Sequence, residues 1–213
     1  MLMEVQKMKK MKTIITIQHS QSVHHTNGMV GSWTDWELSE LGRRQAKHIG
    51  MKLADELSGK DWVMYSSDLA RAKETAEIIG NCLGISFTCC KELRERNLGK
   101  CVGKSVQWLK ENMECQEQTV DDRIFSDAES RRDEWNRLFP FFERVLSDDK
   151  ANIILVSHGD LLSVFNMMWL GLNVETLNRL ELYGLPGGVS HMYQDASGKR
   201  YVRKISDMSY LAG

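Results

Sequence analysis

Two uncharged runs of β-branched and aliphatic residues constrain the fold of this chain more than any other feature. Thr13–Ile17 (TIITI) and Asn152–Ser157 (NIILVS) have the composition of strands that are buried in a sheet. A helical pattern follows each run, after a polar loop in the first case and directly after His158-Gly159 in the second. Strands that alternate with helices predict an α/β fold whose sheet is covered on both faces.

The remaining elements continue this alternation. Further strands are predicted at Asp61–Tyr65 and Ile85–Cys89, and a hairpin at Val189–Gln194 and Tyr201–Ile205. Helices are predicted over Leu38–Leu57, Leu69–Leu83, Glu129–Leu146 and Gly159–Trp169, with caps at Ser66, Ser67 and Asp68 and a kink at Pro140. The polar stretch Glu111–Ala128 is expected to have low order. We therefore expect a three-layer αβα sandwich with a mostly parallel central sheet.

Length, charge and cysteine content limit the classes of protein that the chain can belong to. Its 213 residues suffice for one large domain, which we place at residues 13–213 after a disordered lead-in of residues 1–12. A net charge of -1 argues against bulk binding of nucleic acid, and no apolar run is long enough to span a membrane. The five cysteines have no metal-ligand spacing, so we expect free thiols and a cytoplasmic location.

Two histidines follow the two strongest strands. His19 comes directly after the first strand and Gln18, and His158 follows Ser157 at the end of the later strand. In open α/β sheets, ligands bind beyond the carboxyl ends of the strands, where both histidines are expected. Either histidine alone is more often a surface or capping residue, but two at equivalent strand ends favour one shared site.

Five blocks in a fixed order resemble the histidine phosphatase superfamily, which includes the phosphoglycerate mutase-like proteins. They are TIITIQHSQSVHHTNGMVGSWTDWELSELGRRQA, YSSDLARAKETAEII, LRERNLGKCVGKS, AESRRDEWNRLFPFF and IILVSHGDLL, and the tail SDMSYL resembles the family's closing segment. Any one block alone would be a weak signal, but five in order are specific. The resemblance covers nearly the whole chain from Thr13 to Leu211 and implies the fold of that family.

The resemblance also implies a set of catalytic residues that needs no metal or other cofactor. His19 would attack phosphorus and carry the phosphoryl group, while Arg71 and His158 would hold its oxygens. Glu95 would protonate the leaving alkoxide and then deprotonate water. Four further residues are expected to bind the substrate, namely Gln18, Ser22, His25 and Gly159.

The sequence departs from the family motif beside the nucleophile. The family's Arg-His-Gly is Gln18-His19-Ser20 here, and its loop asparagine falls on His25. An amide in place of a guanidinium removes a permanent positive charge. We expect His24, His25 and His158 to compensate by protonation, so that phosphate affinity rises as the pH falls from about 7.5 to about 6.

The predicted function is hydrolysis of a small phosphate monoester through a phosphohistidine. Two alternatives stay open. The first is a cofactor-dependent phosphoglycerate mutase, which the short stretch from Cys101 to Asn152 disfavours because mutases resemble one another in a longer insertion there. The second is a phosphate-ester-binding protein with weak catalysis, which Gln18 suggests. The sequence identifies neither the physiological substrate nor the oligomeric state.

Overall fold

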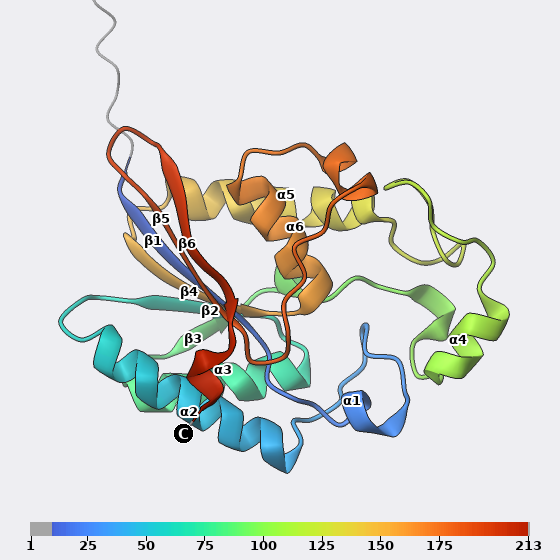
Figure 1. The fold of residues 1–213 in the computed structure, drawn as a ribbon, viewed down its shortest axis with the longest axis horizontal. Coiled ribbons are helices and arrows are strands. Elements are labelled where there is room, and N and C mark those ends of the chain that lie inside the picture. Colours follow the sequence, from blue (N-terminus) through green and yellow to red (C-terminus); the bar gives the residue numbers. More distant parts are fainter. Residues whose placement is uncertain (1–9, 213) are drawn as a thin grey trace, which may run out of the picture.

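The fold is built on one six-stranded sheet in the order β3-β2-β4-β1-β5-β6 (Figure 1). The computed structural model describes residues 10–212. Strands β1 to β4 pair in parallel, β5 pairs antiparallel with β1, and β6 pairs antiparallel with β5. The strands are β1 (Lys12–Gln18), β2 (Val63–Ser66), β3 (Phe87–Cys89), β4 (Asn152–Ser157), β5 (Val189–Gln194) and β6 (Arg200–Asp207).

Helices cover both faces of this sheet, so the predicted α/β sandwich is confirmed. The helices are α1 (His24–Asn27), α2 (Glu40–Glu56), α3 (Ala70–Leu83), α4 (Val106–Asn112), α5 (Arg131–Ser147) and α6 (Gly159–Trp169). Short 3₁₀ turns are found at Lys91–Leu93, Gly99–Cys101, Val174–Asn178 and Met208–Leu211. In Figure 1, α5 and α6 lie above the sheet, and α2 and α3 lie below it.

Strand β1 contributes apolar side chains to both helical layers. Its Ile14 packs with α5 and α6 in one buried cluster, whereas Ile15 and Ile17 pack with α2 and α3 in another. Successive residues of a strand point to opposite faces, so an apolar run of this kind suits a strand that is buried on both sides. The same alternation sends the side chains of Gln18 and His19 to opposite faces of the sheet.

Several local expectations are corrected by the structure. Helix α5 includes Pro140, and its N-cap residue is Ser130, whose side chain forms a reciprocal capping box with Asp133. Helix α3 has Leu69 as its N-cap residue and no side-chain cap, so Ser66, Ser67 and Asp68 are not caps as expected. The polar serines of this segment are therefore available for other contacts.

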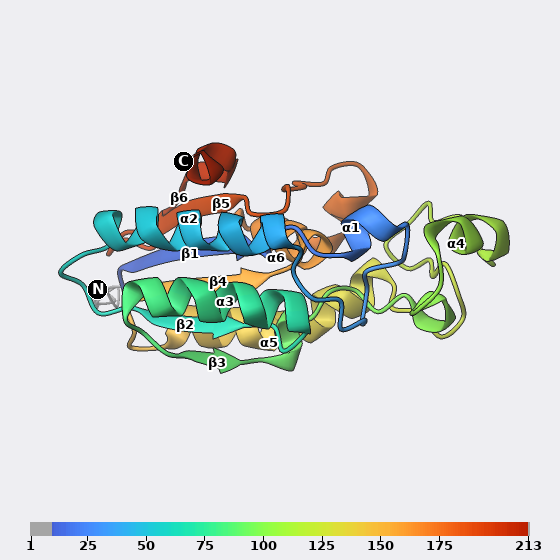
Figure 2. The ribbon, with the colours of Figure 1, turned by 90° about the horizontal axis from the view of Figure 1, so that it is seen from below.

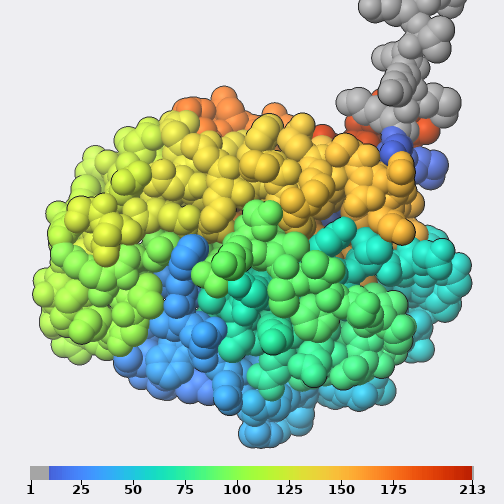
Figure 3. Space-filling view, turned by 180° about the vertical axis from the view of Figure 1, so that it is seen from behind, coloured from blue at the N-terminus to red at the C-terminus, as the bar shows by residue number. Residues whose placement is uncertain are grey.

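The middle region between α4 and α5 has no strand and no long helix, but it contains a small apolar cluster of its own. Val30, from the loop after β1, and Cys101, from the 3₁₀ turn before α4, pack there with Phe125 and Ala128. Figure 3 shows this region in yellow-green beside the blue loop that follows β1, and Figure 2 shows α1 and α4 at the same end of the molecule. Packing between the two segments fixes the loop that carries His24 and His25.

The structure bears on the predicted lead-in and on the predicted lack of a membrane span. Lys12, the last residue of the predicted lead-in, already belongs to β1, and residues 1–9 of that lead-in lie outside the described residues. Across residues 10–212, every helix is too short or too polar to cross a lipid bilayer.

Candidate active site

His19 lies where β1 ends, at the carboxyl edge of the parallel strands. Its amide donates to the carbonyl oxygen of Ser157 on the neighbouring strand β4 (2.9 Å), and its side chain is buried. The ring atom Nδ1 is 2.8 Å from the carbonyl oxygen of Ser20. Because a carbonyl can only accept, Nδ1 carries the proton, and the lone pair of the neutral ring is on Nε2.

Arg71 is the cation that faces this lone pair. It is the second residue of α3 and is buried, and its Nε donates to Nε2 of His19 over 3.1 Å. Its terminal nitrogens donate to the backbone carbonyls of Ser32 and Thr34, each over 2.8 Å. Burial lowers the pKa of Arg71 to about 10, so it stays protonated at neutral pH. The loop after β1 thus positions the guanidinium through its main chain.

His158 completes the buried centre from the end of β4. Its ring centroid is 5.1 Å from that of His19, and its Nε2 is 2.8 Å from the hydroxyl oxygen of Ser67. The other ring nitrogen, Nδ1, is buried and has no hydrogen-bond partner among the described residues. A hydroxyl that donates to Nε2 would leave a proton on Nδ1, and that N–H would be free for a phosphoryl oxygen.

Glu95 approaches from the loop that follows the first 3₁₀ turn. Its carboxylate accepts from the amides of Arg96 (3.0 Å), Leu161 (3.3 Å) and Asp160 (3.4 Å), the last two at the start of α6. Burial and the carboxylate of Asp160 raise its pKa to about 7, although Arg71 and the amides act in the opposite direction. A carboxyl group with a pKa near 7 can both give and take a proton at neutral pH.

The remaining predicted residues of the loop lie around α1. Ser22 is buried, its amide donates to Nδ1 of His25 (3.0 Å), and its hydroxyl lies against Nδ1 of His24. The ring of His25 stacks on that of His19 at a centroid distance of 5.5 Å. Ser22 therefore supports two imidazoles, and His25 lies beside the predicted nucleophile.

Gln18 and Gly159 lie together on the opposite face of β1. A side chain at Gly159 would come within 3.2 Å of the Gln18 amide nitrogen, and one at Gly184 within 2.9 Å of its oxygen. That oxygen has no partner among residues 10–212, and the side chain borders a small cavity beneath α6. The Gln18 side chain thus borders this cavity with residues of α6 and β6, whereas His19, Arg71 and His158 form a separate group.

The expectation that histidine charge compensates for Gln18 is wrong. Burial and the nearby cation Arg71 hold the pKa of both His19 and His158 well below the usual value for histidine. Burial and neighbouring His25 lower the pKa of His24 to about 3, and burial also lowers the pKa of His25. These shifts oppose the gain of charge between pH 7.5 and 6 that the sequence predicted.

Three contacts of the site are absent from the sequence reading. Ser67, read there as a helix cap, touches His158, and the carbonyls of Ser32 and Thr34 hold Arg71. Ser67 follows a predicted strand at the same sheet edge as the histidines, so its position could have predicted a contact with them. The two carbonyls left no signal, because a backbone oxygen is present at every residue.

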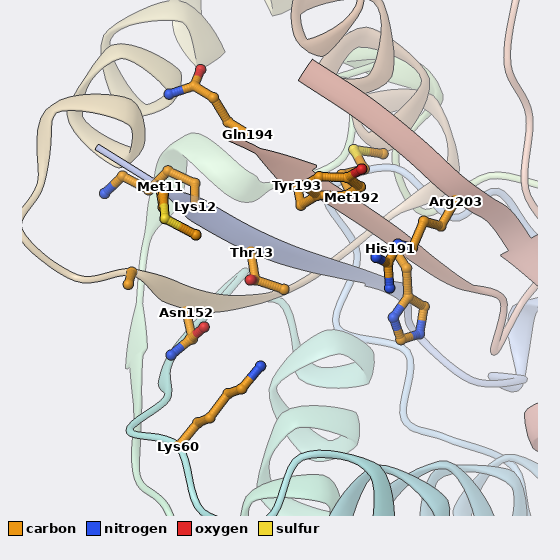
Figure 4. A pocket seen from close by; sticks show the side chains of 11 residues that line it. Met11, Lys12, Thr13, Lys60, Asn152, His191, Met192, Tyr193, Gln194 and Arg203 are labelled. Carbon is orange, nitrogen blue, oxygen red and sulfur yellow. The ribbon is translucent and has the colours of Figure 1, made fainter. Parts of the chain in front are cut away.

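A second cavity, of about 490 Å³, lies at the other end of the sheet (Figure 4). Its lining includes Lys12, Lys60, His191 and Arg203, which suggests an anion site at first sight. However, the Lys12 ammonium donates to two backbone carbonyls, the guanidinium of Arg203 lies over Tyr193, and His191 contacts Tyr210. Because three of these four groups already have partners, the histidine centre is the better candidate for chemistry.

Comparison with known proteins agrees with the buried histidine centre. The family model of the histidine phosphatase superfamily (branch 1) matches residues 14–206. The chain therefore belongs to the histidine phosphatase superfamily, as the five ordered blocks predicted.

The relatives of this chain are named for different activities. The chain is 26% identical over 207 residues to a Hydrogenobacter thermophilus protein named "Putative phosphoserine phosphatase 2", covering 92% of this chain and 97% of that one. It is 27% identical over 212 residues to a 2,3-bisphosphoglycerate-dependent phosphoglycerate mutase of Sinorhizobium fredii, with the same two coverages. A mycobacterial glucosyl-3-phosphoglycerate phosphatase superposes with a TM-score of 0.76 at 21% identity, over 91% of this chain and 98% of that one.

The second of these relatives bears on the choice between phosphatase and mutase. A protein named a mutase is thus about as similar to this chain, over as much of its length, as the relative named a phosphatase. Similarity to these relatives therefore does not by itself separate the two activities. The choice must come from the chemistry of the site.

Proposed function

We propose that this protein is a phosphatase that hydrolyses small phosphate monoesters through a phosphohistidine on His19. The observation that carries the proposal is the lone pair on Nε2 of His19, which faces the Arg71 guanidinium at 3.1 Å beside the ring of His158. A neutral imidazole with a free lone pair is a nucleophile, and two adjacent donors can stabilise charge on a phosphoryl group.

The reaction would proceed in two displacements. In the first, Nε2 of His19 attacks phosphorus, the bond to the ester oxygen breaks, and Glu95 gives its proton to the leaving alkoxide. In the second, Glu95 removes a proton from water, the water oxygen bonds to phosphorus, and the bond to His19 breaks. Arg71 would move its hydrogen bond from Nε2 to the phosphoryl oxygens, and Nδ1 of His158 would donate to another.

Gln18, Ser22, His25 and Gly159 are proposed to act around this centre rather than in the chemical steps. Ser22 and His25 would shape the wall of the pocket beside His19, since one supports the other through a 3.0 Å hydrogen bond. Gly159 gives room for the Gln18 amide, because a side chain there would meet it at 3.2 Å. We propose a cytoplasmic enzyme that acts on a small phosphorylated molecule.

A mutase remains the second candidate because a protein of that name is 27% identical across 92% of this chain. The two activities differ in what receives the phosphoryl group from His19. Glu95 is only partly buried, and its pKa of about 7 suits it to activate water, which favours hydrolysis.

Phosphate release and the phosphoenzyme together test the proposal. We expect steady phosphate release from a panel of phosphate monoesters and negligible interconversion of phosphoglycerates. His19→Ala should reduce turnover by roughly 1,000-fold or more and abolish acid-labile phosphorylation. His48→Ala, on α2 and outside this group of residues, is the matched control and should retain activity.

Two results would contradict the proposal. Wild-type turnover by the His19→Ala variant would exclude His19 as the nucleophile. Efficient isomerisation of phosphoglycerates with little phosphate release would favour the mutase instead.

A further inference from the structure

Three imidazoles converge beside the proposed nucleophile. One ring nitrogen of each of His19, His24 and His25 lies within 4.8 Å of the others, the only such group of at least three potential ligands between residues 10 and 212. The rings of His24 and His25 are 3.9 Å apart at their centroids, and both lie within 6 Å of the ring of His19. Of these three histidines, the proposed mechanism uses only His19, so it does not explain why His24 and His25 cluster with it.

The spacing is close to that of a metal site with three histidine ligands. A tetrahedral Zn²⁺ ion holds imidazole nitrogens at about 2.0–2.1 Å, which places two such nitrogens roughly 3.4 Å apart. The present separation of at most 4.8 Å would need to shorten by at most about 1.4 Å. His24 and His25 lie on a single helical turn at the surface, and His25 is exposed, so their side chains can make this adjustment.

The protonation states suit a metal ligand. A metal ion binds neutral imidazole, and protonated histidines would have to lose a proton first. The amide of Ser22 donates to Nδ1 of His25, so this nitrogen carries a lone pair and not a proton. The Ser20 carbonyl accepts from Nδ1 of His19 and so keeps Nε2 unprotonated, in the way that outer-shell carbonyls orient metal-binding histidines.

Hydrogen bonds within the cluster oppose binding and limit its strength. Arg71 donates to Nε2 of His19, the amide of Ser22 donates to Nδ1 of His25, and the hydroxyl of Ser22 lies against Nδ1 of His24. Any of these nitrogens that binds the metal must give up its present contact, and the positive charge of Arg71 lies close to the ion. The site should therefore be weaker than a structural zinc site, whose ligands are thiolates and imidazoles free of such competition.

We propose that His19, His24 and His25 bind one borderline transition-metal ion, of which Zn²⁺ is the probe of choice, and that the ion inhibits the enzyme by occupying the nucleophile. Imidazole ligands select Zn²⁺, Ni²⁺ and Cu²⁺ over Mg²⁺ and Ca²⁺, which prefer oxygen. The metal is an inhibitor and not a cofactor, so catalysis itself still requires none. Binding goes beyond the proposed function, and only the inhibition rests on it.

The test measures binding and inhibition separately on the full chain. After treatment with a chelator and its removal, Zn²⁺ affinity is measured by competition with a chromophoric chelator, and Co²⁺ provides an absorption spectrum of its ligand field. Inhibition is measured with an aryl phosphate. We expect one ion per chain, a tetrahedral Co²⁺ spectrum, loss of activity with Zn²⁺ and no loss with equal Mg²⁺.

Substitutions then identify the ligands. His24→Asn and His25→Asn should each weaken Zn²⁺ binding by roughly tenfold or more, since even outer-shell losses cost about 10–100-fold. His48→Asn, a histidine on α2, is the matched control and should bind and respond to Zn²⁺ as the parent does. For each variant, the activity with Zn²⁺ is expressed relative to the activity of the same variant without Zn²⁺.

The possible failures can be told apart. Equal Zn²⁺ affinity in the parent, His24→Asn and His25→Asn proteins would overturn the metal site and leave the phosphatase mechanism intact. Tight binding that depends on His24 and His25 but does not reduce activity would support the metal site. That result would show that His19 is not a ligand and would overturn the proposed inhibition, while His19→Ala still tests the nucleophile independently.

Discussion

The two sides of the catalytic centre are built differently. On one side, Arg71 and His158 are buried, start from α3 and the end of β4, and are held by hydrogen bonds to Ser67 and two main-chain carbonyls. On the other side are Gln18, the last residue of β1, whose amide oxygen has no partner among residues 10–212, and two histidines on one helical turn of the following loop. The side with Arg71 and His158, here called the rigid side, supplies the charge and donors for phosphoryl transfer. The side with Gln18, His24 and His25, here called the loop side, has fewer contacts that fix the identity of its residues.

The comparison predicts that changes on the rigid side have the larger effects. Arg71→Lys should lower kcat/KM by roughly 100- to 1,000-fold, because an ammonium cannot replace a guanidinium held by three acceptors. Steady-state kinetics on a monoester will measure the loss, with Arg132→Lys on the surface as the control. A variant within threefold of the parent would show that the guanidinium geometry is not needed.

Glu95→Gln should produce the next largest effect, and it should depend on the leaving group. We expect a loss of about 100-fold with alkyl phosphates and a smaller loss with aryl phosphates, whose leaving groups need less protonation. Because the pKa of Glu95 is raised to about 7, the protonated acid is lost as the pH rises through 7. Phosphoenzyme formation from alkyl esters should therefore slow above pH 7 in the parent.

The variant gives the control for this pH dependence. Glutamine cannot titrate, so the decline above pH 7 should be absent from the Glu95→Gln profile. An unchanged decline in the variant would assign the titration to another group. The histidines are poor candidates for that group, since their pKa values are lowered.

Ser67→Ala should have a moderate effect through His158. Loss of one neutral hydrogen bond is worth about 1 kcal/mol, or roughly fivefold in kcat/KM. Ser66→Ala is the matched control, because that hydroxyl donates to the Ser67 carbonyl and does not contact His158. Equal losses in the two variants would show that Ser67 has only a structural effect on the strand end.

Gln18→Arg should have the smallest effect of the four changes. The side chain at this position lies between Gly159 and Gly184, so a guanidinium has little space to turn toward His19. We expect inorganic phosphate to bind less than about tenfold more tightly at pH 7, which corresponds to less than about 1.4 kcal/mol. Calorimetric titration will measure it, and a larger gain would show that the loop side can be rebuilt as readily as the rigid side.

The sequence predicted the sheet and the placement of His19 and His158 for one physical reason, whereas Arg71 and Glu95 were expected only from the resemblance to the family. Apolar runs such as Thr13–Ile17 identify buried strands, and the residues directly after parallel strands must share one edge of the sheet. The structure therefore brings His19 and His158 together as expected, with Arg71 and Glu95 beside them.

The charge states of the loop could not be predicted in the same way. A pKa depends on burial and on the distance to charges such as Arg71, and neither can be read from the order of residues. The sequence reading gave His24 the pKa of an exposed histidine, whereas the structure lowers it to about 3. The roles of Ser32 and Thr34 were also hidden, because main-chain oxygens hold the arginine.

The pairing of β1 with β4 has a consequence for how such enzymes can diversify. Gln18 lies opposite Ser157 in the parallel register, so the histidines that follow them are kept apart by roughly the 4.8 Å spacing of neighbouring strands. This separation does not depend on the length of chain between the two strands. Whole segments could therefore be lengthened, exchanged or lost between the two strands to admit new substrates while the reacting pair stays in place.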